Sequence, residues 1–199
     1  MLVWINGAFG AGKTQTAFEL HRRLANSHVA DPELIGYGIH RMLPRSARGD
    51  FQDHPQWRSA VAATLADVVA VHPGPVLVPM TLVRAQYFDE IMDALAESGA
   101  EVRHFALLAA PEVLRHRLST RLEALFGSGE SWAMRQIDRC VAALTDDRFA
   151  SHIATDHLTV DEVVETIAHS TGLELVNPRL GAARHRLRRL AVAAQHIRR

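Results

Sequence analysis

The chain has 199 residues, with 22 basic and 22 acidic side chains and 48% hydrophobic residues. This length suits one α/β domain of ordinary size, and the composition excludes a disordered, collagen-like or coiled-coil protein. The apolar runs are too short for a membrane span or a signal peptide, and the single cysteine, Cys140, cannot form an internal disulfide, so we expect a cytoplasmic protein.

The hydrophobic pattern predicts strands and helices in alternation. Short apolar runs predict five strands, at residues 2–5, 28–30, 76–78, 102–108 and 152–156. Amphipathic or capped segments predict helices at residues 13–25, from 31 onward, through 61–68, at 84–97, from 111 onward, at 132–144 and at 160–169. Such alternation predicts a three-layer α/β/α fold, with a parallel sheet covered by helices on both faces.

The clearest motif lies between the first predicted strand and the first predicted helix. Residues 7–14 match the pattern G-x-x-x-x-G-K-[ST] of a P-loop. Its glycines let backbone N–H groups face an anion, while Lys13 reaches the β and γ phosphates and Thr14 can bind Mg²⁺. Lys13 is also the only lysine of the chain. The candidate nucleotide-binding residues are Gly7, Ala8, Phe9, Gly10, Ala11, Gly12, Lys13 and Thr14.

A P-loop alone indicates a bound nucleotide and not a reaction. The guanine-reading N-K-x-D motif of GTPases needs a second lysine, and the chain has none. An LSGGQ-like signature of transport ATPases is also missing from the sequence. A small ATP-dependent kinase is the class that these observations favour.

Several segments together give the chain a family resemblance. They read W-I-N-G-A-F-G at 4–10, Q-T-A-F-E-L-H-R-R-L at 15–24, D-P-E at 31–33, V-P-M-T at 78–81, Q-I-D-R-C at 136–140 and T-D at 155–156. With these segments, over nearly its whole length, the chain resembles the bacterial tunicamycin-resistance protein family, which is similar to nucleotide and small-molecule kinases. The resemblance implies ATP-dependent protection against tunicamycin, a uridine-containing antibiotic with sugar hydroxyls and a fatty acyl chain, and phosphorylation of a hydroxyl is the natural route.

Asp31, after the second predicted strand, is the first catalytic candidate. In kinases of this kind a carboxylate there holds the acceptor hydroxyl or a metal-bound water. The same side chain can instead cap the next helix, with Pro32 at the first helical position. The third predicted strand ends without an acidic residue. Metal binding is therefore less strongly indicated than ATP binding, and Asp31, or else Asp50 or Asp53, would have to support Mg²⁺.

The segment before residues 122–134 resembles the arginine-bearing lid of nucleotide kinases. Arg117 and Arg121 are candidates for neutralising the phosphoryl group during transfer, because an arginine fork binds phosphate oxygens well. A solvent-exposed helix face is the alternative for both. Asp156, at the end of the fifth predicted strand, lies where related kinases form the adenine pocket, and it can equally cap the following helix.

The chain ends in a basic amphipathic segment. Residues 177–199 contain seven arginines and no acidic residue, which leaves 15 basic and 22 acidic residues before them. The acidic body disfavours nucleic acid as a partner. On a helix one apolar stripe forms from Leu180, Ala183, Leu187, Leu190, Ala191, Ala194 and Ile197. Such a helix, at residues 180–199, can contact an anionic membrane or can dock on the acidic body or on a partner subunit.

We therefore expect a P-loop kinase-like domain over residues 1–176, with a lid near 122–134, followed by a C-terminal helix at 177–199. The expected ligands are ATP, Mg²⁺ and tunicamycin or a similar nucleoside antibiotic. The inner membrane face is a possible peripheral location, and the oligomeric state stays open. Two other functions also stay open: a protein that uses ATP to sequester the drug without phosphorylating it, and a metabolic kinase for an unrelated small molecule.

Overall fold

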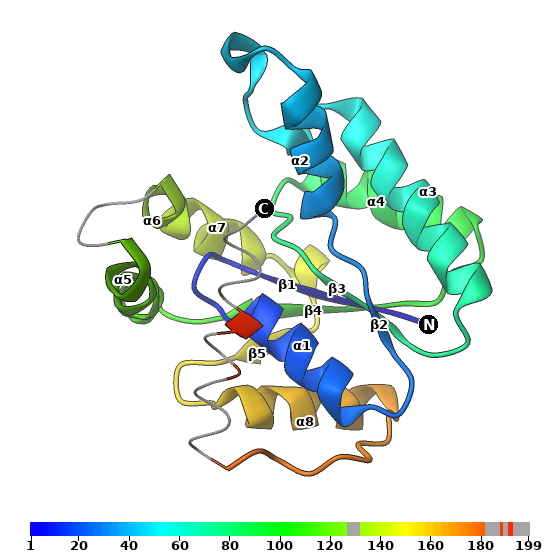
Figure 1. The fold of residues 1–199 in the computed structure, drawn as a ribbon, viewed down its shortest axis with the longest axis vertical. Coiled ribbons are helices and arrows are strands. Elements are labelled where there is room, and N and C mark those ends of the chain that lie inside the picture. Colours follow the sequence, from blue (N-terminus) through cyan, green and yellow to red (C-terminus); the bar gives the residue numbers. More distant parts are fainter. Residues whose placement is uncertain (127–131, 182–187, 189–190, 193–199) are drawn as a thin grey trace.

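Five parallel strands form the centre of the molecule in the computed structural model (Figure 1). The structure describes residues 1–126, 132–181, 188, 191 and 192, with the backbone alone at 121–126. The strands are β1 (Leu2–Gly7), β2 (His28–Val29), β3 (Val76–Pro79), β4 (Val102–Leu108) and β5 (His152–Ala154). They lie in the order β2-β3-β1-β4-β5, and every neighbouring pair is parallel. The predicted α/β class and five-stranded parallel sheet are confirmed.

Helices cover both faces of this sheet (Figure 1). They are α1 (Lys13–Arg23), α2 (Glu33–Met42), α3 (Pro55–Val71), α4 (Ala85–Glu97), α5 (Pro111–Phe126), α6 (Trp132–Arg135), α7 (Ile137–Leu144) and α8 (Val160–Thr171), with short 3₁₀ turns η1 (Arg45–Ala47), η2 (Phe51–Asp53) and η3 (Asp147–Phe149). Alternate residues of β1 point to opposite faces. Val3 and Ile5 pack in the cluster that includes α1 and α8, whereas Leu2 and Trp4 pack in the cluster that includes α3 and α4.

Three predicted boundaries differ from the structure. The sequence predicted that the helical pattern would end before residue 122. Helix α5 instead continues to Phe126, because the helix formers Ala124 and Leu125 extend it. The helix predicted at 132–144 is divided into α6 and α7 by a tight turn in which Gln136 N–H bonds to Ala133 O at 3.2 Å. Within the predicted lid, 122–126 thus belong to α5 and 132–134 to α6, while residues 127–131 lie outside the described part.

The strand order places a topological switch point at the carboxyl ends of β1 and β4. The chain leaves β1 towards β2 on one side, and it leaves β4 towards β5 on the other side. In open parallel sheets, ligands bind where neighbouring connections diverge in this way. Residues 7–14, which directly follow β1, lie at this point.

The first residues of the predicted C-terminal segment are bound to the body of the molecule. Asn177 Nδ2 donates to Arg22 O at 2.9 Å, and Arg22 Nη2 donates to Pro178 O at 2.7 Å. Arg179 forms an ion pair with Glu165 of α8. Hydrogen bonds from Arg179 and from Arg23 hold the pKa of Glu165 at about 2. Residues 177–181 are not helical, contrary to the helix predicted from residue 177, and polar contacts bridge the predicted division of the chain at 176/177.

Part of the predicted C-terminal helix also lies against the body. Arg188, Ala191 and Val192 are helical, and Arg188 Nη2 donates to Phe18 O of α1 at 3.3 Å, while Val192 is buried. The other residues of the predicted helix, 182–187, 189–190 and 193–199, lie outside the described part. These contacts favour docking on the body, and membrane contact stays a prediction. Among the described helices, none has the length and apolar character needed to cross a membrane.

The substitution Val192→Asp separates docking on the body from membrane contact. If Val192 packs on the body, a carboxylate there is buried, and the free energy of unfolding should fall by about 2–4 kcal/mol. Denaturant unfolding measures this change, with Val71→Asp at an exposed position as the matched control. Unchanged stability, together with weaker binding to anionic vesicles at low salt, would instead support membrane contact.

Candidate functional site

The phosphate loop, residues 7–14, has a backbone that requires glycine at particular points. Gly10 has a φ of 85°, and a Cβ on it would lie 2.8 Å from Leu114 O at the start of α5. Gly12 has a φ of 96°, and no atom lies within 4 Å of the place that its Cβ would take. Gly10 therefore allows close packing of the loop on α5, whereas the space beside Gly12 is open.

Lys13 and Thr14 begin α1 at the end of this loop. The ammonium of Lys13 lies 3.1 Å from Ala8 O and 5.6 Å from the centre of the Phe9 ring, so the side chain is folded over the loop. Gly12 occupies the N-cap position, and no side chain caps the helix there. An open space at a helix N-terminus, with an ammonium on the same loop, suits the phosphates of a nucleotide.

Asn6 and Thr81 hold the start of the phosphate loop. The Asn6 side-chain oxygen accepts from Gly7 N–H at 2.8 Å, and the Thr81 hydroxyl donates to Gly7 O at 2.9 Å. Neither residue was among the sequence-based candidates. A signal was present, because each is a polar residue at the end of a buried apolar run. The role of these residues could not be predicted, because Thr81 and its partner Gly7, like Asn6 and its partner Leu82, lie far apart in the sequence.

His104 of β4 supports Asn6 from the opposite side. Its Nε2 lies 3.2 Å from Asn6 Nδ2, and its Nδ1 lies 3.2 Å from Ala150 O. The tautomer with a proton on Nδ1 donates to Ala150 and accepts from Asn6. Burial, together with a smaller effect of the nearby His152, lowers the pKa of His104 to about 4, so the ring is neutral at pH 7.

Asp31 lies on the same edge of the sheet as the phosphate loop, just after β2. Its Oδ1 accepts from Glu33 N–H at 3.0 Å, a contact that resembles the expected cap, although Pro32 and not Asp31 occupies the N-cap position of α2. The carbonyl of the next residue, Pro32, accepts from Trp57 Nε1 at 3.1 Å, so α3 fixes this turn. The role of Asp31 towards a substrate stays a prediction.

Asp50 and Asp53, the other carboxylates considered for Mg²⁺, have protein partners. Asp50 Oδ1 caps η2 by accepting from Gln52 N–H at 3.0 Å. Asp53 lies 2.9 Å from Arg84 Nη1 in an ion pair. Within the described part of the chain, no group of three or more His, Cys, Asp or Glu side chains could hold a metal ion.

Arg117 is directed to the loop after β5. Its Nη2 donates to Thr155 O at 2.6 Å, and its Nη1 lies 3.3 Å from the Thr155 hydroxyl. Asp156 Oδ1 accepts from Ala110 N–H at 2.8 Å, just before α5. The structure thus brings Arg117 and Asp156 together at the junction of α5 and β5. The side chain of Arg121 lies outside the described part.

Trp132 connects the lid region to the phosphate loop. Its ring packs edge to face on Phe9, with the ring centres 5.3 Å apart. Trp132 remains half exposed. Helix α6 therefore contacts the phosphate loop through one aromatic pair, which the sequence did not predict.

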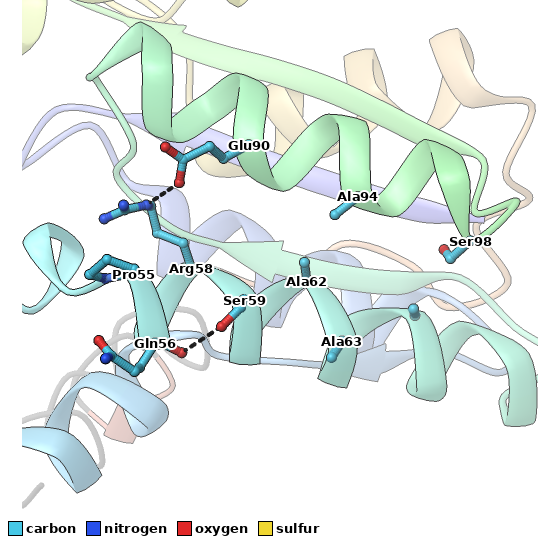
Figure 2. A pocket seen from close by; sticks show the side chains of 10 residues that line it. Pro55, Gln56, Arg58, Ser59, Ala62, Ala63, Glu90, Ala94 and Ser98 are labelled. Carbon is cyan, nitrogen blue, oxygen red and sulfur yellow. Dashed lines mark hydrogen bonds and ion pairs between the residues drawn. The ribbon is translucent and has the colours of Figure 1, made fainter.

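A separate groove of about 570 Å³ lies between α3 and α4 (Figure 2). Small side chains such as Ala62, Ala94 and Ser98 line it, and Arg58 crosses it at one end to form an ion pair with Glu90 (Figure 2). None of its lining residues belongs to the phosphate loop. The groove is therefore not the nucleotide site.

Comparison with known proteins agrees with this geometry. Residues 2–146 match the sequence profile of a family described as an AAA domain. The structure of the tunicamycin resistance protein of Deinococcus radiodurans has a TM-score of 0.75 and 30% sequence identity to this chain, over 89% of this chain and 99% of that one. The sequence has no match among proteins of curated function.

Two more distant structures share the fold. The APS kinase of Mycobacterium tuberculosis, in complex with AMPPNP and APS, has a TM-score of 0.55 and 16% identity, over 86% of this chain and 96% of that one. A gluconokinase from Sinorhizobium meliloti has a TM-score of 0.59 and 13% identity, over 85% of this chain and 94% of that one. The P-loop kinase-like fold predicted from the sequence is confirmed.

The buried neutral ring of His104 makes stability depend on pH. The pKa of His104 is about 4 in the folded protein and 6.5 in the unfolded chain, so between these values the unfolded chain binds more protons. The free energy of unfolding should therefore fall as the pH falls from 6.5 to 4, by roughly 1–3 kcal/mol from this residue. Denaturant unfolding over this range measures the slope. The variant His104→Gln keeps an acceptor near Asn6 and cannot titrate, so an equally steep slope in it would contradict the assignment.

Proposed function

The chain belongs to the AAA domain family and to the family of the tunicamycin resistance protein of Deinococcus radiodurans, and on this premise we propose that it is a cytoplasmic, ATP-dependent phosphotransferase acting on tunicamycin or a similar nucleoside antibiotic. The observation that carries the proposal is the phosphate loop. The open space at Gly12 and the ammonium of Lys13 on the same loop suit a nucleoside triphosphate.

The proposed nucleotide contacts come from residues 7–14. Their backbone N–H groups bind phosphate oxygens, and Lys13 exchanges its contact with Ala8 O for the β and γ phosphates. MgATP supplies the transferable phosphoryl group. Thr14 is the proposed protein ligand of Mg²⁺, with Asp31 acting through a water, because the described residues form no metal-binding cluster of their own.

Asp31 is the proposed residue that orients the acceptor. Its position on the edge of the sheet that carries the phosphate loop supports this role, and its bond to Glu33 N–H uses one carboxylate oxygen. An ionised carboxylate can accept several hydrogen bonds, so the bond to Glu33 N–H does not by itself prevent Asp31 from holding an acceptor hydroxyl or taking its proton. Capping and catalysis can therefore be performed by the same side chain.

Further proposed roles belong to residues of α5 and of the loop after β5, namely Arg117, Arg121 and Asp156. The bonds from Arg117 to Thr155 support a positioning role for the loop after β5, where Asp156 would line the adenine side of the site. Charge neutralisation by Arg117 on the transferred phosphoryl group requires it to leave these bonds. Arg121, one helical turn further along α5, is proposed for the same task.

One observation favours drug sequestration without turnover. The segment after β3 offers Met80 and Thr81 at the place where many P-loop enzymes carry an acidic residue, and the Thr81 hydroxyl is bonded to Gly7. A binding protein needs ATP and drug sites but no group that activates a hydroxyl. The two functions differ in whether the drug gains a phosphate.

The substitution Lys13→Ala tests nucleotide binding. Loss of the ammonium removes charge-assisted hydrogen bonds to phosphate, so the Kd for MgATP should rise at least about tenfold. The fold should survive, because Lys13 is only partly buried and its loss leaves no cavity. Calorimetric titration measures the Kd, with Arg103→Ala as a control that removes an exposed cation from β4. Equal affinity in folded Lys13→Ala protein would contradict the assignment of the site.

The substitution Asp31→Asn separates catalysis from capping. Asparagine can still accept from Glu33 N–H, but it has no charge and cannot take a proton. Drug phosphorylation should fall about 10²-fold or more while the Tm stays nearly unchanged. Normal turnover in a variant of lower Tm would show that Asp31 serves only as a cap.

A further inference from the structure

Gly7, the first residue of the phosphate loop, has both of its backbone polar groups bound by side chains. Its N–H donates to Asn6 Oδ1 at 2.8 Å, and its carbonyl accepts from the Thr81 hydroxyl at 2.9 Å. Gly7 also has a φ of 152°, and a Cβ on it would lie 3.0 Å from Leu107 O. Two hydrogen bonds and close packing on Leu107 therefore fix the position of Gly7, where the phosphate loop begins.

Asn6 uses the full hydrogen-bonding capacity of its amide. Besides the bond to Gly7, its Oδ1 accepts from Leu82 N–H at 3.0 Å. Its Nδ2 donates to Leu82 O at 2.7 Å and to His104 Nε2 at 3.2 Å. Asn6 is 0% exposed, its bonds to Gly7 and Leu82 are buried, and its bond to His104 is partly buried. A buried polar group with every partner in place fixes its neighbours firmly.

Thr81 connects the loop to another part of the molecule. Its hydroxyl binds Gly7, and its backbone carbonyl accepts from Gln52 Nε2 of η2 at 2.9 Å. The Gln52 carbonyl in turn accepts from Arg58 of α3 at 2.7 Å. A continuous chain of hydrogen bonds thus runs from α3 through η2 and Thr81 to the phosphate loop.

This arrangement has a consequence for anion binding. A loop that presents backbone N–H groups to phosphates binds better when its conformation is already fixed, because less entropy is lost on binding. The ladder of β1 ends at Gly7, so strand pairing cannot fix the residues beyond it. Asn6 and Thr81 supply the missing contacts at this boundary.

We propose that Asn6 and Thr81 are positioning residues that set the nucleotide affinity of the phosphate loop, acting through Gly7. The proposal rests on the proposed binding of MgATP to that loop. It assigns a role to the segment after β3, because Thr81 of this segment binds the first residue of the phosphate loop. Neither side chain needs to touch the nucleotide.

Three variants of threonine test this inference. Thr81→Val keeps the shape but removes the hydroxyl and leaves Gly7 O unpaired, so the Kd for MgATP should rise roughly five- to tenfold. Thr81→Ser keeps the hydroxyl, and its Kd should stay within about twofold of the unaltered protein. Thr171→Val is the matched control, since it removes a hydroxyl that donates to Ile167 O in α8. Calorimetry gives each Kd, and thermal unfolding gives each Tm.

The pattern of results separates positioning from general stability. A purely structural hydroxyl would lower the Tm of Thr81→Val and leave its Kd for MgATP equal to that of Thr171→Val, and this result would overturn the proposal. If the unaltered protein does not bind MgATP, the proposed function fails first. If it binds MgATP and Thr81→Val binds equally well, only the positioning role fails.

A second variant covers the case in which Thr81→Val does not fold. Asn6→Ala removes the acceptor for Gly7 N–H without adding bulk, and in folded protein it should weaken MgATP binding by a similar factor. Unchanged affinity in folded Asn6→Ala protein would contradict the proposal. If neither variant folds, the two residues determine folding and not nucleotide affinity, and the proposal is wrong.

Discussion

The arrangement of this molecule follows from one backbone constraint at the end of its central strand. The chain must leave β1 and enter α1 through a loop in which Gly7, Gly10 and Gly12 take positive φ values. Such a loop has no ladder of its own to stabilise it. The parts around it supply the contacts: α5 packs on Gly10, α6 packs on Phe9, and the segment after β3 binds Gly7.

Helix α1, near the start of the chain, packs on α8, near its end. Helix α1, which begins in the loop, is covered by α8 and by the segment that follows it. Arg23, buried near the end of α1, bonds to Asp161 and to Glu165 of α8. These two carboxylates offset part of the cost of removing the Arg23 guanidinium from water. The helix that points at the proposed phosphate site is thereby held at its far end as well.

Much of this organisation could be predicted from the sequence because it depends on local patterns. The strand at residues 2–5, the P-loop at 7–14 and the alternation of helices and strands each follow from spacing within a few residues. The contacts of Asn6 with Leu82 and His104 could not be predicted, because they join residues 76 and 98 positions apart. The bonds from Arg117 to Thr155 could not be predicted either, since the direction of this side chain depends on how α5 lies against the loop after β5.

The position of the C-terminal segment could not be predicted from the sequence either. A helix with an apolar stripe opposite arginines can bind a membrane surface, a partner subunit or an acidic body equally well. The described contacts of Arg188 with Phe18 and Glu19 favour the body, because Glu19 is almost fully buried and its charge is balanced by arginines. The sequence alone does not show that the Glu19 carboxylate of α1 lies near Arg188.

The central claim is that the phosphate loop serves transfer of a phosphoryl group to a nucleoside antibiotic. Incubation of the protein with tunicamycin and MgATP, followed by mass spectrometry of the drug, tests it most directly. We expect the drug to gain the mass of one phosphate, with one ADP formed for each drug molecule modified, and to remain unmodified with Lys13→Ala protein. Unmodified tunicamycin in the presence of folded protein that binds both ligands would contradict the claim and identify a sequestering protein.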